Sequence, residues 1–123
     1  LVVSKLYEYQ YCQKSILIQV FLILVSNARA ALRLQENRVI RIDFVIREES
    51  VIIRFSDNGP GIPKQVKEKI FDPFFTGKPV GEGSGLGLFT ARRAVESLGG
   101  TLRYLEAEEL TTFELDLPAG EAA

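Results

Sequence analysis

The chain has 123 residues, of which 46% are hydrophobic and 25% are charged, and its formal net charge is −1. This length predicts a single domain over 1–123, and the near-zero charge argues against a nucleic-acid surface, which needs a basic excess. The chain contains no histidine, which excludes His-based general-base catalysis and Ser-His-Asp triads. Its single cysteine, Cys12, excludes an intramolecular disulfide.

The longest apolar run, residues 16–25, is about half as long as the ~20 residues needed to cross a bilayer. We therefore predict a buried helix there, in a soluble and cytoplasmic protein without a secretory signal. The chain begins with Leu1 rather than Met, which suggests a piece of a longer protein. Any contact with a membrane would then come through other regions of the parent.

Hydrophobic periodicity predicts the elements of the first half of the chain. Residues 1–14 have no clear assignment beyond an edge strand or linker, since 2–11 alternate loosely. A helix is predicted from a Ser15 cap to Leu34, and it is apolar nearly all round, which predicts burial on every side. Alternation of apolar and charged residues predicts a half-buried strand over 40–46, and a second strand follows over 51–56.

The second half begins with a long loop and then becomes periodic again. Seven of the ten glycines and four of the five prolines lie in 59–87, which indicates a shaped, functional loop. A helix is predicted over 86–98, ended by Gly99 and Gly100, with strands near 101–105 and 111–117. This order of elements predicts an α+β sandwich with helices on one face of a sheet.

Two polar residues stand where their surroundings are expected to be apolar. Asn27 lies within the first helix, where a carboxamide either bonds to nearby backbone or offers its oxygen to a hard cation such as Mg²⁺. Asp57 ends a predicted strand just before Gly59 and Gly61, which allow a flat ligand to approach the backbone closely. A plain turn is the alternative for this second motif.

Two further motifs lead up to the start of the second predicted helix. Residues 81–88 are rich in glycine, and such a segment exposes backbone N–H groups that, with the helix dipole, favour anions. A glycine hinge without a ligand is the alternative. Residues 71–78 bring three phenylalanines, which need burial, next to Lys78. That lysine is either a solvated surface residue or a cation for an anion at the glycine loop.

In this order and spacing the four motifs resemble the ATP-binding catalytic domain of sensor histidine kinases, a superfamily shared with gyrase and MutL-type ATPases. The N, G1, F and G2 boxes of that family cover residues 19–88 here, and the last two predicted strands look like its closing strands. The resemblance does not extend to 1–14. It implies a Bergerat-type two-layer α/β sandwich with a mixed, mostly antiparallel sheet.

The resemblance implies a role for each matching residue. Asp57 would accept a hydrogen bond from the adenine amino group, and Thr111, which shares a strand face with apolar residues, would contact adenine through a water. Asn27 would hold Mg²⁺ and, with Lys78, make up the catalytic residues. Residues 71–83 would form a lid over ATP. The other implied nucleotide-binding residues are Gly59, Gly61, Ile62, Phe71, Thr76, Gly83, Gly85, Leu86, Gly87 and Leu88.

The chain departs from the family pattern at two positions. Ile23 stands where hydrolytic relatives have the glutamate that activates water, which predicts very slow ATP hydrolysis. Ala30 stands where many relatives carry a basic residue, so that Lys78 or Arg29 would meet the phosphates. The short lid looks most like that of the nitrogen-regulation type of sensor kinase.

The resemblance implies a protein-histidine kinase domain that uses ATP and Mg²⁺. It would transfer the γ-phosphate to a histidine on a separate helical dimerisation and phosphoacceptor domain, and a response regulator would then receive it. Without a histidine of its own the chain is expected to be inactive alone, and nucleic acid is not an expected partner. An anti-sigma-type serine kinase and a degenerate ATP sensor that transfers nothing are the alternatives.

Overall fold

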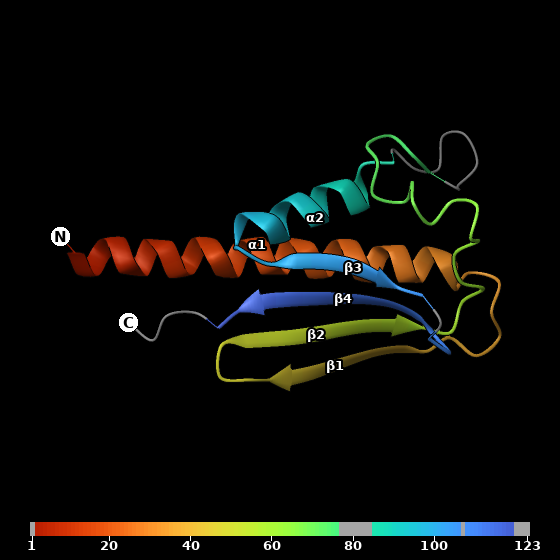
Figure 1. Ribbon diagram of the computed structural model, residues 1–123, viewed down its shortest axis with the longest axis horizontal. Coiled ribbons are helices and arrows are strands. Elements are labelled where there is room, and N and C mark those ends of the chain that lie inside the picture. The colour runs from red at the N-terminus through yellow and green to blue at the C-terminus, as the bar shows by residue number, and fades with distance from the viewer. Residues whose placement is uncertain (1, 77–84, 107, 120–123) are drawn as a thin grey trace.

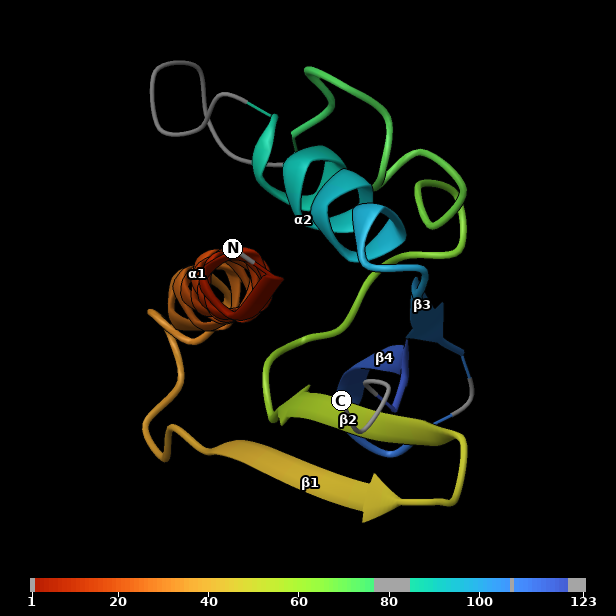
Figure 2. The ribbon, with the colours of Figure 1, turned by 90° about the vertical axis from the view of Figure 1, so that its left-hand side faces the viewer.

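The computed structural model describes residues 2–76, 85–106 and 108–119, which form two layers (Figure 1). The elements in chain order are α1 (Val2–Ala31), β1 (Ile40–Ile46), β2 (Ser50–Asp57), α2 (Gly87–Ser97), β3 (Thr101–Leu105) and β4 (Thr111–Pro118). The strands make one sheet in the order β1-β2-β4-β3, and both helices lie on one face of it (Figure 2). The predicted α+β two-layer sandwich is confirmed.

The sheet itself differs from the expected mixed type. All three pairs of neighbouring strands among the described residues are antiparallel. The reason is that β1 with β2 and β3 with β4 form two hairpins, and β4 runs back along β2 to join them. The glycine stop predicted after the second helix is confirmed, since Gly99 has φ +81° and follows Ser97 by two residues.

The register of the two central strands sorts their side chains onto an inner and an outer face. Ile53 of β2 pairs with Leu115 of β4, and both are buried on the inner face beneath the helices. Four residues further along each ladder, Asp57 pairs with Thr111. Because side chains alternate along a strand, this pair lies on the same inner face, at one end of the sheet.

Both helices contribute to a single core above the sheet. The ring of Phe21 in α1 packs edge-on against the ring of Phe55 in β2, with 4.9 Å between ring centroids. The buried apolar residues of the core cluster are Val20, Leu24, Ile53, Phe55, Ile70, Ala91, Val95, Leu102, Phe113, Leu115 and Leu117. Because these side chains fill the space between the helices and the sheet, their packing determines how far α1 lies from the strands.

The first helix corrects three predictions. It begins at Val2, so the edge strand expected over residues 2–11 is wrong, and Ser15 lies inside the helix rather than capping it. Residues 2–11 contain no glycine or proline to separate them from the helix that follows, and the helix simply continues through them. It ends at Ala31, three residues before the predicted Leu34.

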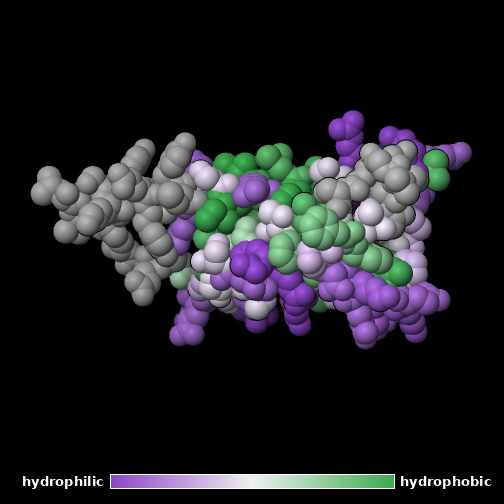
Figure 3. Space-filling view, turned by 90° about the horizontal axis from the view of Figure 1, so that it is seen from above, coloured by the Kyte–Doolittle hydropathy of each residue, from purple (hydrophilic) through white to green (hydrophobic). Residues whose placement is uncertain are grey.

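Burial of α1 on every side is also wrong. Val20 and Leu24 are buried, but Ile18, Leu22 and Val25 are 51%, 65% and 37% exposed. The exposed three recur at helical spacing and share one face of α1, because only the opposite face meets the core. Figure 3 shows apolar residues gathered along the exposed part of this helix.

The segment Gln13–Ala31 is long and apolar enough to cross a membrane by length and composition, although the apolar run alone was predicted to be too short. Core helices and signal sequences meet the same criterion. In this fold Val20 and Leu24 of the segment pack into the core with the sheet and α2. One face of the helix therefore belongs to the core of the sandwich.

The first strand is confirmed in position but not in burial. Ile40, Ile42, Phe44 and Ile46 project from the inner face of β1, and they are 39%, 40%, 58% and 81% exposed. A half-buried strand was expected. The difference arises because β1 is the last strand of the sheet and the helices cover the strands beside it.

Candidate functional site

A pocket with a cavity volume of about 70 Å³ opens at the end of the sheet where β2 finishes and β4 begins. One wall is α1, the floor is formed by strands, and the loop after β2 makes the rim. The lining residues are Leu24, Asn27, Ala28, Ala31, Ile40, Phe55, Ser56, Asp57, Gly61, Ile62, Thr111 and Phe113. The structure thus brings together Asn27, Asp57, Gly61, Ile62 and Thr111, five of the residues singled out from the sequence.

Asp57 is the buried acid of this pocket. It is 5% exposed, and burial raises the pKa of its carboxyl, while the backbone N–H of Gly59, which donates to Oδ1 over 2.8 Å, lowers it in part. Within the described part of the chain this is the hydrogen bond that the carboxylate accepts. Its remaining acceptor capacity faces the pocket, where it suits a ligand that donates a hydrogen bond.

The two glycines of the loop after β2 leave room beside this acid. A Cβ on Gly59 would lie 2.7 Å from Oδ1 of Asp57 and would displace the hydrogen bond that its own N–H makes. Gly61 has φ +82°, in the left-handed region, and a Cβ there would lie 3.7 Å from Oγ1 of Thr111. Both glycines are therefore required by geometry, beyond forming a turn.

Thr111 supplies the second polar group of the pocket. Its Oγ1 is buried and has no hydrogen-bond partner among the described residues. The next residue, Thr112, faces the opposite side of the sheet and bonds to Ser56 through their hydroxyls, 3.0 Å apart. A buried hydroxyl without a partner next to a pocket is a place for a water or a ligand atom. The placement of Thr111 on the inner face agrees with the sequence argument.

Asn27 enters the pocket from α1, between Leu24 and Ala28 on the lining. One turn earlier, Ile23 contacts the start of α2, since its Cγ2 lies 3.5 Å from where a Cβ on Gly87 would be. An apolar side chain of α1 therefore lies against the amino-terminal end of α2. Among the α1 residues that line the pocket, Asn27 is the one whose side chain could hold a metal ion, because its carboxamide oxygen has the hard character that Mg²⁺ prefers.

Asn58, which the sequence motif left without a role, holds the loop between α1 and β1. Its Oδ1 accepts the N–H of Val39 over 2.9 Å, and its Nδ2 donates to the carbonyl of Asn37 over 2.6 Å. Its own carbonyl accepts from Nε2 of Gln35 over 3.1 Å. These bonds tie the end of α1 to the Asp57 turn and so position two walls of the pocket. The sequence signal that could have indicated this role of Asn58 is the presence of amide side chains in the loop between α1 and β1.

Two residues predicted to bind nucleotide lie away from the pocket. Phe71 packs edge-on against Phe113, with 6.3 Å between centroids, and the guanidinium of Arg92 sits 4.6 Å above its ring. Thr76 is exposed. Phe71 is drawn to the core because a phenylalanine gains most from burial there. The structure does not bring either side chain to the lining.

The two ends of the predicted lid meet in space. Phe74 has φ +67° although it is not glycine, and Gly85 has φ +73°. A Cβ on Gly85 would lie 2.3 Å from the carbonyl carbon of Phe74, so only glycine permits this contact. Lys78 and Gly83 lie outside the described residues, with most of the lid.

The glycine motif leads directly into the second helix. Leu86 precedes the first residue of α2, Gly87, and Leu88 packs against the core. The backbone N–H groups of the first turn are therefore directed out of the helix end, as expected for an anion site. These residues do not line the pocket itself.

The chain is similar to known ATP-binding proteins over most of its length. Residues 12–121 match the family described as histidine kinase-, DNA gyrase B- and HSP90-like ATPases. The sensor protein CitS of Halalkalibacterium halodurans is 39% identical over 114 residues, which are 89% of this chain and 21% of CitS. The sensory histidine kinase/phosphatase NtrB of Rhizobium leguminosarum bv. phaseoli is 32% identical over 127 residues, covering 92% of this chain and 33% of NtrB.

Among solved structures, the catalytic domain of histidine kinase ThkA is similar with a TM-score of 0.72 at 34% identity, over 85% of this chain and 67% of that one. The chain belongs to the histidine kinase-, DNA gyrase B- and HSP90-like ATPase family. Within it, the chain is a catalytic ATPase domain of the two-component sensor histidine kinase class, as the four motifs predicted. It spans a third or less of the two curated relatives named above.

Proposed function

We propose that the pocket binds the adenine of Mg·ATP and that the domain delivers the γ-phosphate to a histidine on a separate helical phosphoacceptor domain. ATP binding is what the family implies. The observation that carries the proposal is the Asp57–Thr111 pair, a buried carboxylate opposite a buried hydroxyl that has no hydrogen-bond partner in the described part of the chain. A response regulator would take the phosphoryl group afterwards, in the cytoplasm.

The chemistry of this pair fits adenine. The carboxylate of Asp57 accepts a hydrogen bond from the exocyclic amino group, and Thr111 completes the recognition directly or through a water. Gly61 allows the flat base to lie against the backbone. Guanine has a carbonyl where adenine has its amino group, and a carboxylate repels it, so GTP is discriminated against by the same residue.

The triphosphate is then directed toward the start of α2. Its oxygens meet the backbone N–H groups of the first turn of α2, and Lys78 and Gly83 of the lid add a cation and a further N–H. The described residues hold no cluster of three or more acidic, histidine or cysteine side chains. Mg²⁺ would therefore be held by the Asn27 oxygen, phosphate oxygens and water, a combination that this ion commonly accepts. The ion would neutralise charge on the transferring group.

The contact of Ile23 with the start of α2 supports transfer rather than hydrolysis. The side chain offers no acceptor that could orient or deprotonate a water near the phosphates. Bound ATP would therefore remain unhydrolysed until a histidine imidazole of another domain is positioned in line with the γ-phosphate. The same feature favours the second candidate, an ATP sensor that binds without transferring.

Replacing Asn27 by alanine should weaken ATP binding about tenfold with Mg²⁺ present, because one metal ligand is lost. In the presence of a chelator the variant and the original chain should bind ATP equally. Isothermal titration calorimetry under both conditions measures the difference. The matched control is Ser26→Ala, an exposed neighbour on the same helix, which should change neither value. An equal loss with and without Mg²⁺ would make Asn27 a structural residue.

Transfer is tested with radiolabelled ATP and the helical phosphoacceptor domain of a similar sensor kinase. The chain alone should acquire no label and release phosphate very slowly; mixing should place acid-labile label on the added domain only. The rate should be low, because two untethered domains lack the effective concentration of a linked pair. Acid-stable label on this chain would support the serine-kinase alternative. Tight ATP binding without label on any histidine partner would support the ATP sensor.

A further inference from the structure

The open edge of β1 has the features of a pairing surface. β1 is the last strand of the sheet, and within the described residues no strand lies beyond it. Its seven residues alternate apolar and charged side chains apart from Val45. Sheet proteins usually protect such an edge with a short strand, a bulge, a proline or a covering loop. No proline interrupts β1, and its pairing with β2 runs without a bulge from Ile40 to Ile46.

The free backbone groups of this edge belong to the even-numbered residues. The carbonyl of Val39 accepts from Asn58, and the N–H of Arg47 donates to Ser50, so odd-numbered residues face β2. Antiparallel ladders alternate, and the N–H and C=O of Ile40, Ile42 and Phe44 therefore point away from the sheet. A strand added at this edge would find regularly spaced donors and acceptors.

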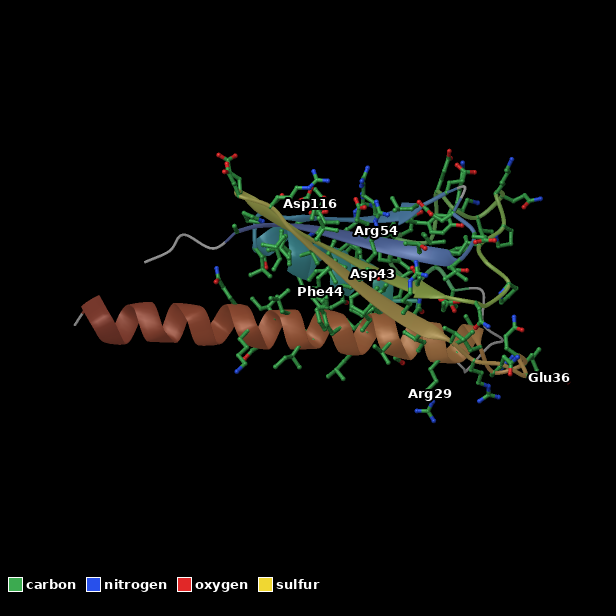
Figure 4. All side chains as sticks on the ribbon, turned by 90° about the horizontal axis from the view of Figure 1, so that it is seen from below. Arg29, Glu36, Asp43, Phe44, Arg54 and Asp116 are labelled. Carbon is green, nitrogen blue, oxygen red and sulfur yellow. The ribbon has the colours of Figure 1, made fainter. Side chains whose placement is uncertain are left out.

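The side chains of the same residues are apolar and exposed. Phe44 is 58% exposed and projects to the face of the sheet on which α1 lies, as Figure 4 shows. Arg41 and Asp43 project to the other face and form an ion pair of 2.9 Å, with side chains 63% and 46% exposed. An added strand would bury apolar groups on one face and meet charges on the other.

Charges form an alternating row across the outer face of the sheet. The register pairs Arg103 of β3 with Glu114 of β4, Glu114 with Arg54 of β2, and Arg54 with Asp43 of β1. Glu114 accepts hydrogen bonds from both arginines. The last charge of the row, at the open edge, is the negative charge of Asp43. A strand added at this edge would therefore be most stable with a positively charged residue opposite Asp43.

We propose that this residue is Arg41 of a second copy of the chain, and that two copies pair β1 to β1 in antiparallel orientation about Ile42. This register places Ile42 opposite its own copy, Arg41 opposite Asp43, and Ile40 opposite Phe44. It also sets even-numbered residues opposite even-numbered ones and odd opposite odd, as the outward N–H and C=O groups of the even-numbered residues require. Shifting by one step in either direction would set Asp43 against Asp43 or Arg41 against Arg41, which is unfavourable.

The pairing yields an eight-stranded sheet with a twofold axis perpendicular to it. Such an axis keeps the helices of both copies on one side, and the interface is isologous, since the same surface is used twice. Ile40 also lines the adenine pocket, so the second copy would lie next to that pocket's wall. The interface is small, and a dissociation constant of roughly tens of micromolar is expected.

Sedimentation velocity of the 123-residue chain, at concentrations from about 5 to about 200 μM, tests the pairing. The sedimentation coefficient should rise with concentration to that of a dimer. Arg41→Glu and Asp43→Arg should each be monomeric over this range, because each sets like charges opposite one another. An equimolar mixture of the two variants should dimerise again, because every opposed pair in the heterodimer then carries opposite charges.

The matched control is Arg47→Glu, which makes the same charge change just beyond β1 and should leave dimerisation unchanged. Thermal unfolding of each variant checks that the exposed substitutions leave the fold intact. A chain that stays monomeric at the highest concentration overturns the proposal. So does a dimer that survives Arg41→Glu, or a mixture that fails to reassociate; either would assign association to another surface, such as the exposed face of α1.

Discussion

Replacing Asp57 by asparagine should lower the affinity for ATP by about ten- to a hundredfold, the largest effect on binding expected of any single pocket residue. The carboxylate is the acceptor proposed for the adenine amino group, and an amide places a donor against a donor in part of its orientations. Because asparagine keeps an Oδ1, the hydrogen bond from the N–H of Gly59 is retained. The affinity for ATP is measured by calorimetry.

The same variant should not lose stability, and this separates binding from folding. Burial raises the pKa of Asp57, so the folded state binds its proton more tightly than the unfolded state does. The stability that this contributes is present below the unfolded-state pKa and is lost as pH rises through the folded-state pKa. At neutral pH the buried charge is therefore unfavourable, and asparagine should leave the melting temperature of the ligand-free chain equal or higher.

A pH series adds a third readout on the original chain. ATP affinity should begin to fall on acidification at a pH above the ordinary range of an aspartate, because protonation of Asp57 removes the acceptor. The matched control is Asp116→Asn, which removes one negative charge from β4 outside the pocket lining. It should leave ATP affinity unchanged. An unaltered affinity in Asp57→Asn would remove the adenine assignment.

Replacing Gly85 by alanine should lower the free energy of unfolding by at least about 2 kcal/mol. Gly85 has φ +73°, where an L side chain is strained, and its Cβ would lie 2.3 Å from the carbonyl carbon of Phe74. The neighbour is backbone, so no side chain can rotate away. The two ends of the lid would have to separate, and chemical denaturation measures the cost.

Gly87→Ala is the matched control for that substitution. A Cβ there would lie 3.5 Å from the Ile23 methyl, an ordinary contact, and Gly87 begins a helix in which alanine is favoured. Stability should be equal or slightly higher. If Gly85→Ala unfolds at the same denaturant concentration as Gly87→Ala, the contact with Phe74 does not hold the lid ends together.

Local patterns in the sequence were sufficient for most elements and for the class of the protein. Alternation predicted β1 and the strands near Thr111 and Thr101, because a period of two needs only neighbouring residues. The order of Asn27, the Asp57 turn and the glycines before α2 was enough to indicate an ATP-binding domain of the histidine kinase type. The family match, the similar sensor proteins and the similar solved structure confirm that assignment.

Only the tertiary structure decided how those elements meet. The register of β2 on β4 places Oγ1 of Thr111 beside Asp57, which lies 54 positions earlier in the chain, and none of the residues that the structure describes forms a hydrogen bond with that hydroxyl. Phe71 packs against the core and does not line the pocket, whereas the apolar side chains on the inner face of β1 are exposed. Hydrophobicity alone would predict burial for both. Burial depends on which surfaces are left uncovered once distant segments pack, and a local pattern of residues carries no information about that.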